Sequence, residues 1–159
     1  MKSKLKRILS RIWSVIIVGL VPMESGLADD YAKGLVKERI SVRAVLPQMP
    51  SKTIINQEYR YPQNPPLLEA YIIEIPAGQS TSIHLHQVPL LAYVLSGELE
   101  TNYGSKGIKT IRAGDMFVEA IEWCHFGKAA GSSPVRLLAM YLNELDSKRQ
   151  KSIECKTLQ

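Results

Sequence analysis

The sequence predicts an all-β domain, and three observations lead to this prediction. Short apolar or alternating runs, with the length of strands rather than helices, fill the middle of the chain. Glycine-containing turns divide these runs. The sequence shows no internal repeat, so we expect one barrel or sandwich rather than a duplicated one.

Five runs are expected to form the principal strands, at 69–75, 91–96, 98–103, 108–111 and 136–142. Gly78, Gly97 and Gly114 lie at turns beside these runs, where a residue that tolerates positive φ is needed. Their expected role is therefore structural.

The flanking segments are expected to form less regular structure. Residues 40–46 and 54–61 are expected as outer strands, followed by a proline-rich break. Residues 29–37 are expected as a short helix or an unstructured arm. The polar, charged segment 147–159 is expected as a mobile tail or a short helix.

The N-terminus has the pattern of a secretory signal peptide over residues 1–28. Five basic residues accompany an apolar run at 12–21, and Gly26 and Ala28 are small residues at the positions that a signal peptidase reads. The run is about half of the roughly twenty residues that a membrane-spanning helix needs. We therefore expect cleavage near Ala28 and a periplasmic or secreted protein without a stable membrane anchor. An uncleaved anchor is the alternative.

Most of the positive charge of the chain lies in this leader. Residues 1–28 contribute +4 of the net charge of +5, which leaves about +1 for the rest. No basic patch interleaved with aromatic residues follows, so nucleic acid is not an expected partner. The remaining 131 residues predict one domain, at 29–146, followed by the charged tail 147–159.

All three histidines fall into two short motifs. His84 and His86 form an H-x-H pair, and residues two apart in a strand face the same side. His125 lies eleven residues after Gly114, in a second glycine-led block. Three imidazoles with open positions beside them can hold zinc, copper, iron or nickel. The alternative for H-x-H alone is two half-buried strand histidines without a ligand role.

The two blocks, GQSTSIHLHQVPLLAYVLSG at 78–97 and GDMFVEAIEWCH at 114–125, resemble the cupin signature. The resemblance implies a single cupin domain, which is a double-stranded β-helix or jelly-roll barrel with a metal at its mouth. It implies that His84, His86 and His125 bind a divalent transition metal, with iron, manganese, nickel, copper or zinc as candidates.

The chain departs from the family pattern at four positions. Leu90 stands where the family has a glutamate ligand, and the expected proline, glycine and asparagine are replaced by Ala120, Glu122 and Ala129. The sequence is similar to small exported bacterial cupins that carry a glutamate in the second block instead. In this chain that residue is Glu119, so the resemblance implies a fourth ligand there. A surface carboxylate or a partner for an arginine is the alternative, and the site is then three-histidine.

The two cysteines, Cys124 and Cys155, either form a disulfide or remain free thiols. A bridge between Cys124 and Cys155 would enclose about thirty residues and contribute roughly 3 to 4 kcal/mol. A buried free thiol is the plain alternative. Trp123 and Phe126 flank His125 and are either pocket walls or core residues.

The sequence is compatible with two classes of function, an enzyme and a binding protein. The resemblance makes a metal-dependent oxidoreductase of the dioxygenase kind the first expectation, with an isomerase or lyase as variants. A non-catalytic cupin that binds a small ligand or a metal is the alternative. A small molecule is the expected partner in both, catalytic residues are not assigned, and the oligomeric state is open, with a homodimer among the options.

Overall fold

The computed structural model describes residues 43–46 and 51–159. In this part of the chain the regular structure consists of nine strands and one short 3-10 helix. The all-β prediction is therefore confirmed. The predictions for residues 1–28 and 29–37 lie outside the described residues. The described part holds no helix long and apolar enough to cross a membrane.

The strands follow one another with short connections between most of them. They are β1 (Pro66–Ile75), β2 (His84–Leu85), β3 (Leu90–Ser96), β4 (Glu98–Asn102), β5 (Ile108–Arg112), β6 (Met116–Val118), β7 (Phe126–Ala129), β8 (Val135–Glu144) and β9 (Ile153–Glu154), with the 3-10 helix η1 (Gly104–Lys106) after β4. The five predicted principal strands correspond to β1, β3, β4, β5 and β8.

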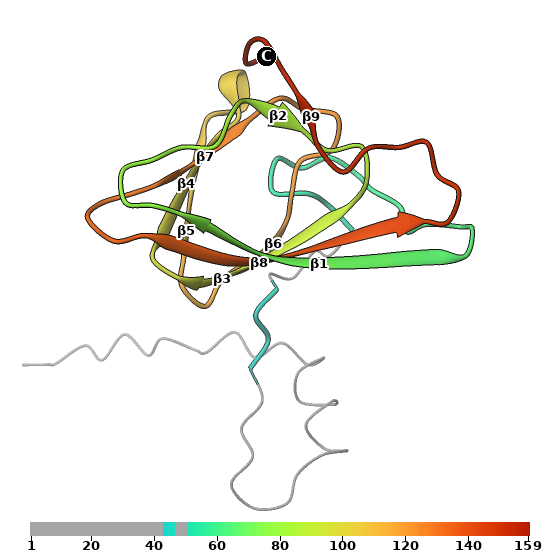
Figure 1. Cartoon of the computed structure of the whole chain (residues 1–159), viewed down its shortest axis with the longest axis horizontal. Coiled ribbons are helices and arrows are strands. Elements are labelled where there is room, and N and C mark those ends of the chain that lie inside the picture. Colours follow the sequence, from blue (N-terminus) through green and yellow to red (C-terminus); the bar gives the residue numbers. More distant parts are fainter. Residues whose placement is uncertain (1–42, 47–50) are drawn as a thin grey trace, which may run out of the picture.

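The strands form three antiparallel sheets. One has the order β1-β8-β3-β6, the second has the order β5-β4-β7, and the third pairs β2 with β9. Figure 1 shows the four-stranded sheet across the lower part of the domain, with β4 and β7 to one side and β2 with β9 above. Single bridges from Ser80 to Lys128 and from His84 to His125 join the segment around β2 to the strand β7 region.

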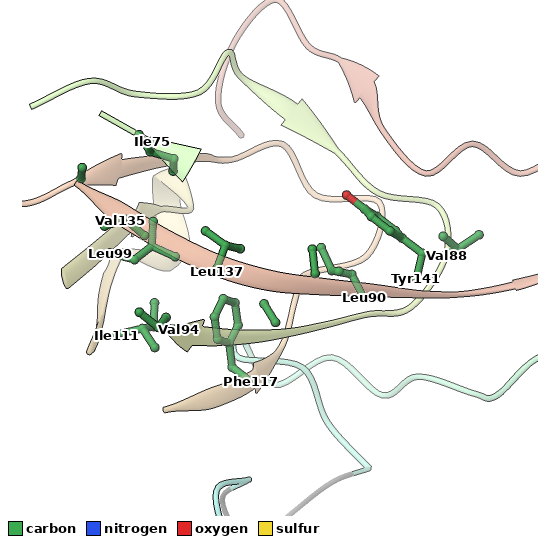
Figure 2. Close-up of a cluster of buried hydrophobic side chains, with 13 residues drawn as sticks. Ile75, Val88, Leu90, Val94, Leu99, Ile111, Phe117, Val135, Leu137 and Tyr141 are labelled. Atoms are coloured by element: carbon green, nitrogen blue, oxygen red, sulfur yellow. The ribbon is translucent and has the colours of Figure 1, made fainter. Parts of the chain in front are cut away.

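The hydrophobic core lies between the sheets, and it is formed by strands in which buried and exposed residues alternate. In β8, every second residue from Val135 to Asn143 is buried, and the intervening residues are at least partly exposed. Such a period of two is the property of a strand with one buried face. Leu90 and Val94 of β3 face the same core as Leu137 of β8, as Figure 2 shows.

The turn glycines occupy the predicted conformations. Gly78, Gly97 and Gly114 have φ of 72°, 82° and 93°. A Cβ atom on Gly97 would lie 2.4 Å from the carbonyl oxygen of Pro134, so this turn needs glycine for space as well as for φ.

The prediction of outer strands at 54–61 and 40–46 is wrong for the described residues. Residues 43–46 contain no strand, and residues 54–61 contain turns and a single bridge from Lys52 to Glu58. The Gln57 side chain replaces strand pairing: its Nε2 donates to Ile121 O at 2.8 Å, and its Oε1 accepts from Ile121 N at 3.0 Å. An amide side chain offers both a donor and an acceptor, so it can pair with a turn as a neighbouring strand would.

The prediction of a mobile tail or short helix at 147–159 is also wrong. Strand β9 in this segment pairs with β2, and Cys155 forms a disulfide with Cys124. Of the two alternatives for the cysteines, the structure therefore has the bridge. A charged composition predicted solvation, but main-chain pairing and one covalent bond hold this segment against the domain.

Candidate metal centre

Main-chain pairing places two of the histidines side by side. His84 and His125 lie opposite each other in an antiparallel bridge, in which each N–H donates to the other's carbonyl oxygen at 2.9 Å. Side chains that are directly opposite in such a pair project from the same face. The ring centroids of His84 and His125 are 4.7 Å apart.

His86 joins this pair through the alternation of the chain. It lies two residues after His84 and shares its face, with ring centroids 4.9 Å apart. Its carbonyl oxygen accepts from Glu122 N at 2.7 Å, which ties it to the turn before His125. One ligand atom from each of the three rings lies within 4.8 Å of the others, so small side-chain adjustments bring them around one ion.

Each of the three imidazoles is fixed by a main-chain carbonyl. Nδ1 of His84 lies 2.8 Å from Ser82 O, Nδ1 of His125 lies 2.8 Å from Trp123 O, and Nδ1 of His86 lies 2.5 Å from Lys151 O. Because a carbonyl only accepts, each Nδ1 carries the proton in the neutral ring. Each Nε2 then keeps its lone pair, which is the form of histidine that binds a metal.

Burial keeps two of these rings neutral. His86 is 3% exposed, and burial lowers its pKa to about 3. Burial also lowers the pKa of the less buried His84. Desolvation disfavours the charged imidazolium in both cases. These two donors therefore fit a divalent transition metal, since neither has to lose a proton near neutral pH.

Glu119 lies beside the three histidines and is itself buried. Its Oε2 is 3.6 Å from His125 Nε2, too far for a hydrogen bond. Its Oε1 accepts from Tyr103 OH at 2.6 Å and from Ala120 N at 2.7 Å. One carboxylate oxygen is thus committed to the protein, and the other faces the imidazole of His125. Ligation by Glu119 stays a prediction.

Tyr103 is the main feature of the site that sequence reasoning missed. It is fully buried, and burial, followed by the charge of Glu119, raises its pKa well above the usual value. The hydroxyl therefore remains protonated and donates to Glu119. The available signal was the alternation of Leu99, Thr101 and Tyr103, which places all three on the inner face of β4 and its extension.

A cavity of about 70 Å³ opens beside the histidines. Apolar side chains make up much of its wall, including Leu90 at the position where the family has a glutamate. Thr101 also lines it, and its Oγ1 lies near the Tyr103 hydroxyl but has no hydrogen-bond partner within the described part of the chain. Two larger hollows, of about 390 and 480 Å³, lie away from the three histidines.

Neither aromatic neighbour of His125 lines this cavity. Trp123 donates from Nε1 to Tyr103 O at 2.9 Å and packs against a small cluster with Ile55 and Ala120. Trp123 is therefore a packing residue rather than a pocket wall. Phe126 is likewise absent from the cavity wall. Glu122, also near the site, is exposed and has a φ of 52° in the turn, where the family pattern has glycine.

An all-β fold with three imidazoles brought together on its inner face defines a class of proteins that can hold a metal in an open site. Residues 71–141 match the family model of the cupin domain, so this part of the chain is similar to that family. The fold expected from the resemblance is confirmed, although the described strands form three sheets rather than one continuously bonded barrel.

Solved structures with a similar fold include proteins of several kinds. The polyketide cyclase RemF from Streptomyces resistomycificus is 18% identical, with 57% of this chain and 61% of that chain covered and a TM-score of 0.48. The oxalate decarboxylase of Lactobacillus farciminis is 24% identical, with 55% and 26% covered and a TM-score of 0.46. A Klebsiella pneumoniae protein with a double-stranded β-helix domain is 16% identical, with 62% and 86% covered and a TM-score of 0.47.

The chain thus spans less than two thirds of the length of the first two of these proteins. At these identities and TM-scores, the likenesses do not carry an activity over to this chain. No curated protein matches it significantly.

The position of Glu119 gives a prediction about metal affinity. Glu119→Gln keeps the size of the side chain but removes the negative charge beside His125, and we expect metal affinity to fall by about tenfold to 100-fold. Glu122→Gln is the matched control, because the Glu122 side chain is exposed. The metal affinity of this variant is expected to equal that of wild type. Competition with a chromophoric chelator measures both. Equal affinities for wild type and Glu119→Gln would leave a three-histidine site, with Glu119 acting only on the orientation of its neighbours.

Proposed function

We propose that this protein is a metal-dependent oxidoreductase, of the dioxygenase kind, that acts on a small molecule. The observation that carries the proposal is the set of three Nδ1–carbonyl contacts, which leave the Nε2 lone pairs free in a cluster whose ligand atoms lie within 4.8 Å of one another, beside a cavity. Three protein ligands with open positions are typical of catalytic rather than closed structural metal sites.

His84, His86 and His125 would hold a divalent ion, and iron, manganese, nickel, copper and zinc are the candidates. The redox-active members of this group would supply electron transfer between an organic substrate and O2. The residues of the chain contribute position and environment. Glu119 places one negative charge at the site, and Tyr103 holds that carboxylate in a fixed orientation.

The cavity supports a substrate that enters with a small, mostly apolar group. A volume of about 70 Å³ holds only a few non-hydrogen atoms, since one water needs roughly 10 to 15 Å³ on a comparable measure. Leu90 replaces a carboxylate with an apolar wall here. Thr101, whose hydroxyl lies near that of Tyr103, adds a polar group to the wall of the cavity.

A non-catalytic cupin that binds a metal or a small ligand is the second candidate, and one observation favours it. Glu119 is the carboxylate that lines the cavity, and one of its oxygens is already occupied by Tyr103 and Ala120. Among the cavity-lining residues, few groups therefore remain for general acid or base chemistry.

Oxygen consumption separates the two candidates. Protein loaded with Fe(II), Mn(II), Ni(II) or Cu(II) is expected to consume O2 with a phenolic, diketone or thiol substrate, as an oxygen electrode measures. His125→Ala removes one ligand and is expected to abolish this uptake. Inactivity of every metal form against a broad panel, together with metal-dependent binding of a small ligand, would favour the binding protein.

We also propose that the protein is exported after cleavage near Ala28. The Cys124–Cys155 disulfide supports this proposal, because such bonds persist in oxidising compartments. The mature protein is expected to begin at or near Asp29, which intact-mass measurement of the secreted or periplasmic form would test. A species that retains Met1 in a membrane fraction would instead indicate an uncleaved anchor.

A further inference from the structure

Residues 147–159, called here the C-terminal strap, run along the strand that carries two of the histidines. His84 is paired with Glu154, and Leu85 is paired with Ile153. Beyond this short pairing, Cys155 N donates to Ile83 O at 2.8 Å. The strap thus contributes main-chain hydrogen bonds on the side of β2 away from His125.

The strap continues these contacts past His86. Gln87 N donates to Gln150 O at 3.1 Å, and Gln150 N donates to Gln87 Oε1 at 3.0 Å. The segment from Ile83 to Gln87, with both ligand histidines in it, is therefore bonded to the strap at its two ends.

The most specific contact is the one between Lys151 O and Nδ1 of His86. His84 and His125 are fixed by carbonyls only two residues away in sequence, at Ser82 and Trp123. The carbonyl that fixes His86 comes from 65 residues away. Local chain geometry sets the first two contacts, but the third exists only while the strap is in place.

Two latches keep the strap in place. The Cys124–Cys155 disulfide joins it to the residue that precedes His125. On the other side, Lys151 Nζ donates to Glu69 Oε1 at 2.6 Å and to Tyr71 OH at 2.7 Å, both on β1. Lys151 therefore presents its carbonyl to His86 while its side chain is anchored to the neighbouring sheet.

We propose that the C-terminal strap is a positioning element of the metal centre, and that its latches set the metal affinity through the orientation of His86. This inference rests on the proposed metal site. The strap lies outside the residues that match the cupin family model, 71–141, so the match itself does not account for it. A hydrogen bond to the far nitrogen of a ligand imidazole fixes its tautomer and rotation, and its loss typically weakens metal affinity by about tenfold to 100-fold.

Two variants test the latches separately. The double variant Cys124→Ala/Cys155→Ala opens the disulfide without leaving a thiol that could itself bind metal. Lys151→Met keeps the disulfide and the carbonyl but removes the anchor to Glu69 and Tyr71. We expect Co(II) and Zn(II) affinity to fall by about tenfold to 100-fold in the double variant. A smaller fall, in the same direction, is expected for Lys151→Met.

Arg136→Met is the matched control. Arg136 of β8 bonds to Glu74 of β1 at 2.8 Å. Arg136→Met therefore also removes an ion pair that ends on β1, but one in which no residue of the strap takes part. Its metal affinity is expected to equal that of wild type. The visible spectrum of the Co(II) form is the second readout, because a rotated His86 changes the ligand geometry and its absorption bands. A merely structural role for the strap would lower thermal stability and leave this spectrum unchanged.

The outcomes separate the inference from the proposed function. Wild-type protein that binds neither ion would overturn the metal site itself. Wild-type binding with unchanged affinity and Co(II) spectrum in both strap variants would overturn only the inference. Circular dichroism shows whether the double variant folds. If it does not, Lys151→Met alone tests the inference, and an unchanged metal affinity and Co(II) spectrum in that variant overturn the proposal.

Discussion

Replacing His86 by alanine is expected to abolish high-affinity metal binding. The substitution removes one of three convergent imidazoles, and the expected loss of affinity exceeds the roughly 100-fold that follows from disturbing a supporting contact. The domain is expected to stay folded, because the principal hydrophobic cluster contains no histidine. Elemental analysis after loading with Fe(II), Mn(II), Ni(II), Cu(II) and Zn(II) measures the bound ion.

The comparison requires folded protein on both sides, and circular dichroism provides that control. Wild-type protein that stays free of all five metals after loading would contradict the metal site. A His86→Ala variant that binds an ion as tightly as wild type would show that His86 is a core residue rather than a ligand.

The metal-free protein is expected to lose stability as the pH falls below about 6.5. Burial lowers the pKa of His86 to about 3 in the folded state, whereas an unfolded chain has the ordinary histidine pKa near 6.5. Between these values the unfolded state binds a proton at His86 that the folded state does not. The free energy of unfolding therefore decreases with falling pH, by at most about 1.4 kcal/mol per pH unit for this residue.

Urea unfolding of wild type and His86→Ala across this range isolates the effect. Alanine cannot titrate, so the stability difference between the two proteins should change by about 2 kcal/mol between pH 6 and pH 4.5, with wild type losing more. Exposed carboxylates far from His86 affect both proteins alike and cancel. Parallel pH profiles would mean that His86 becomes protonated in the folded protein as readily as in the unfolded chain.

The parts of the fold that could be predicted are those set by local periodicity. Strand β8 shows why: its alternation is complete over ten residues, so both its type and its buried face can be read from the sequence. In residues 54–61, Gln57 pairs with a turn 64 residues away and no ladder forms. A single side-chain contact of this kind leaves no periodic pattern.

The residues of the candidate site likewise fall into those that local spacing indicates and those that act through distant contacts. His84 and His86 share a face because they are two residues apart, and His125 was recognised from its motif. Tyr103 and Lys151 act through contacts that span 16 and 65 residues. Alternation along β4 places Tyr103 on the inner face, but no spacing indicates the partner of either residue. The charged composition of the C-terminal strap even predicted the opposite of its role, because composition does not report main-chain pairing.

The fluorescence of Trp123 can report metal binding at the site. This residue is the only tryptophan among the described residues, and its indole donates to the main chain of Tyr103, whose hydroxyl reaches Glu119. It also lies two residues before His125 and supplies the carbonyl that fixes that imidazole. A paramagnetic ion bound by the histidines would therefore sit close to a fluorophore of the protein itself. Quenching of the indole emission during titration with Cu(II) or Ni(II) would follow occupancy without any added dye.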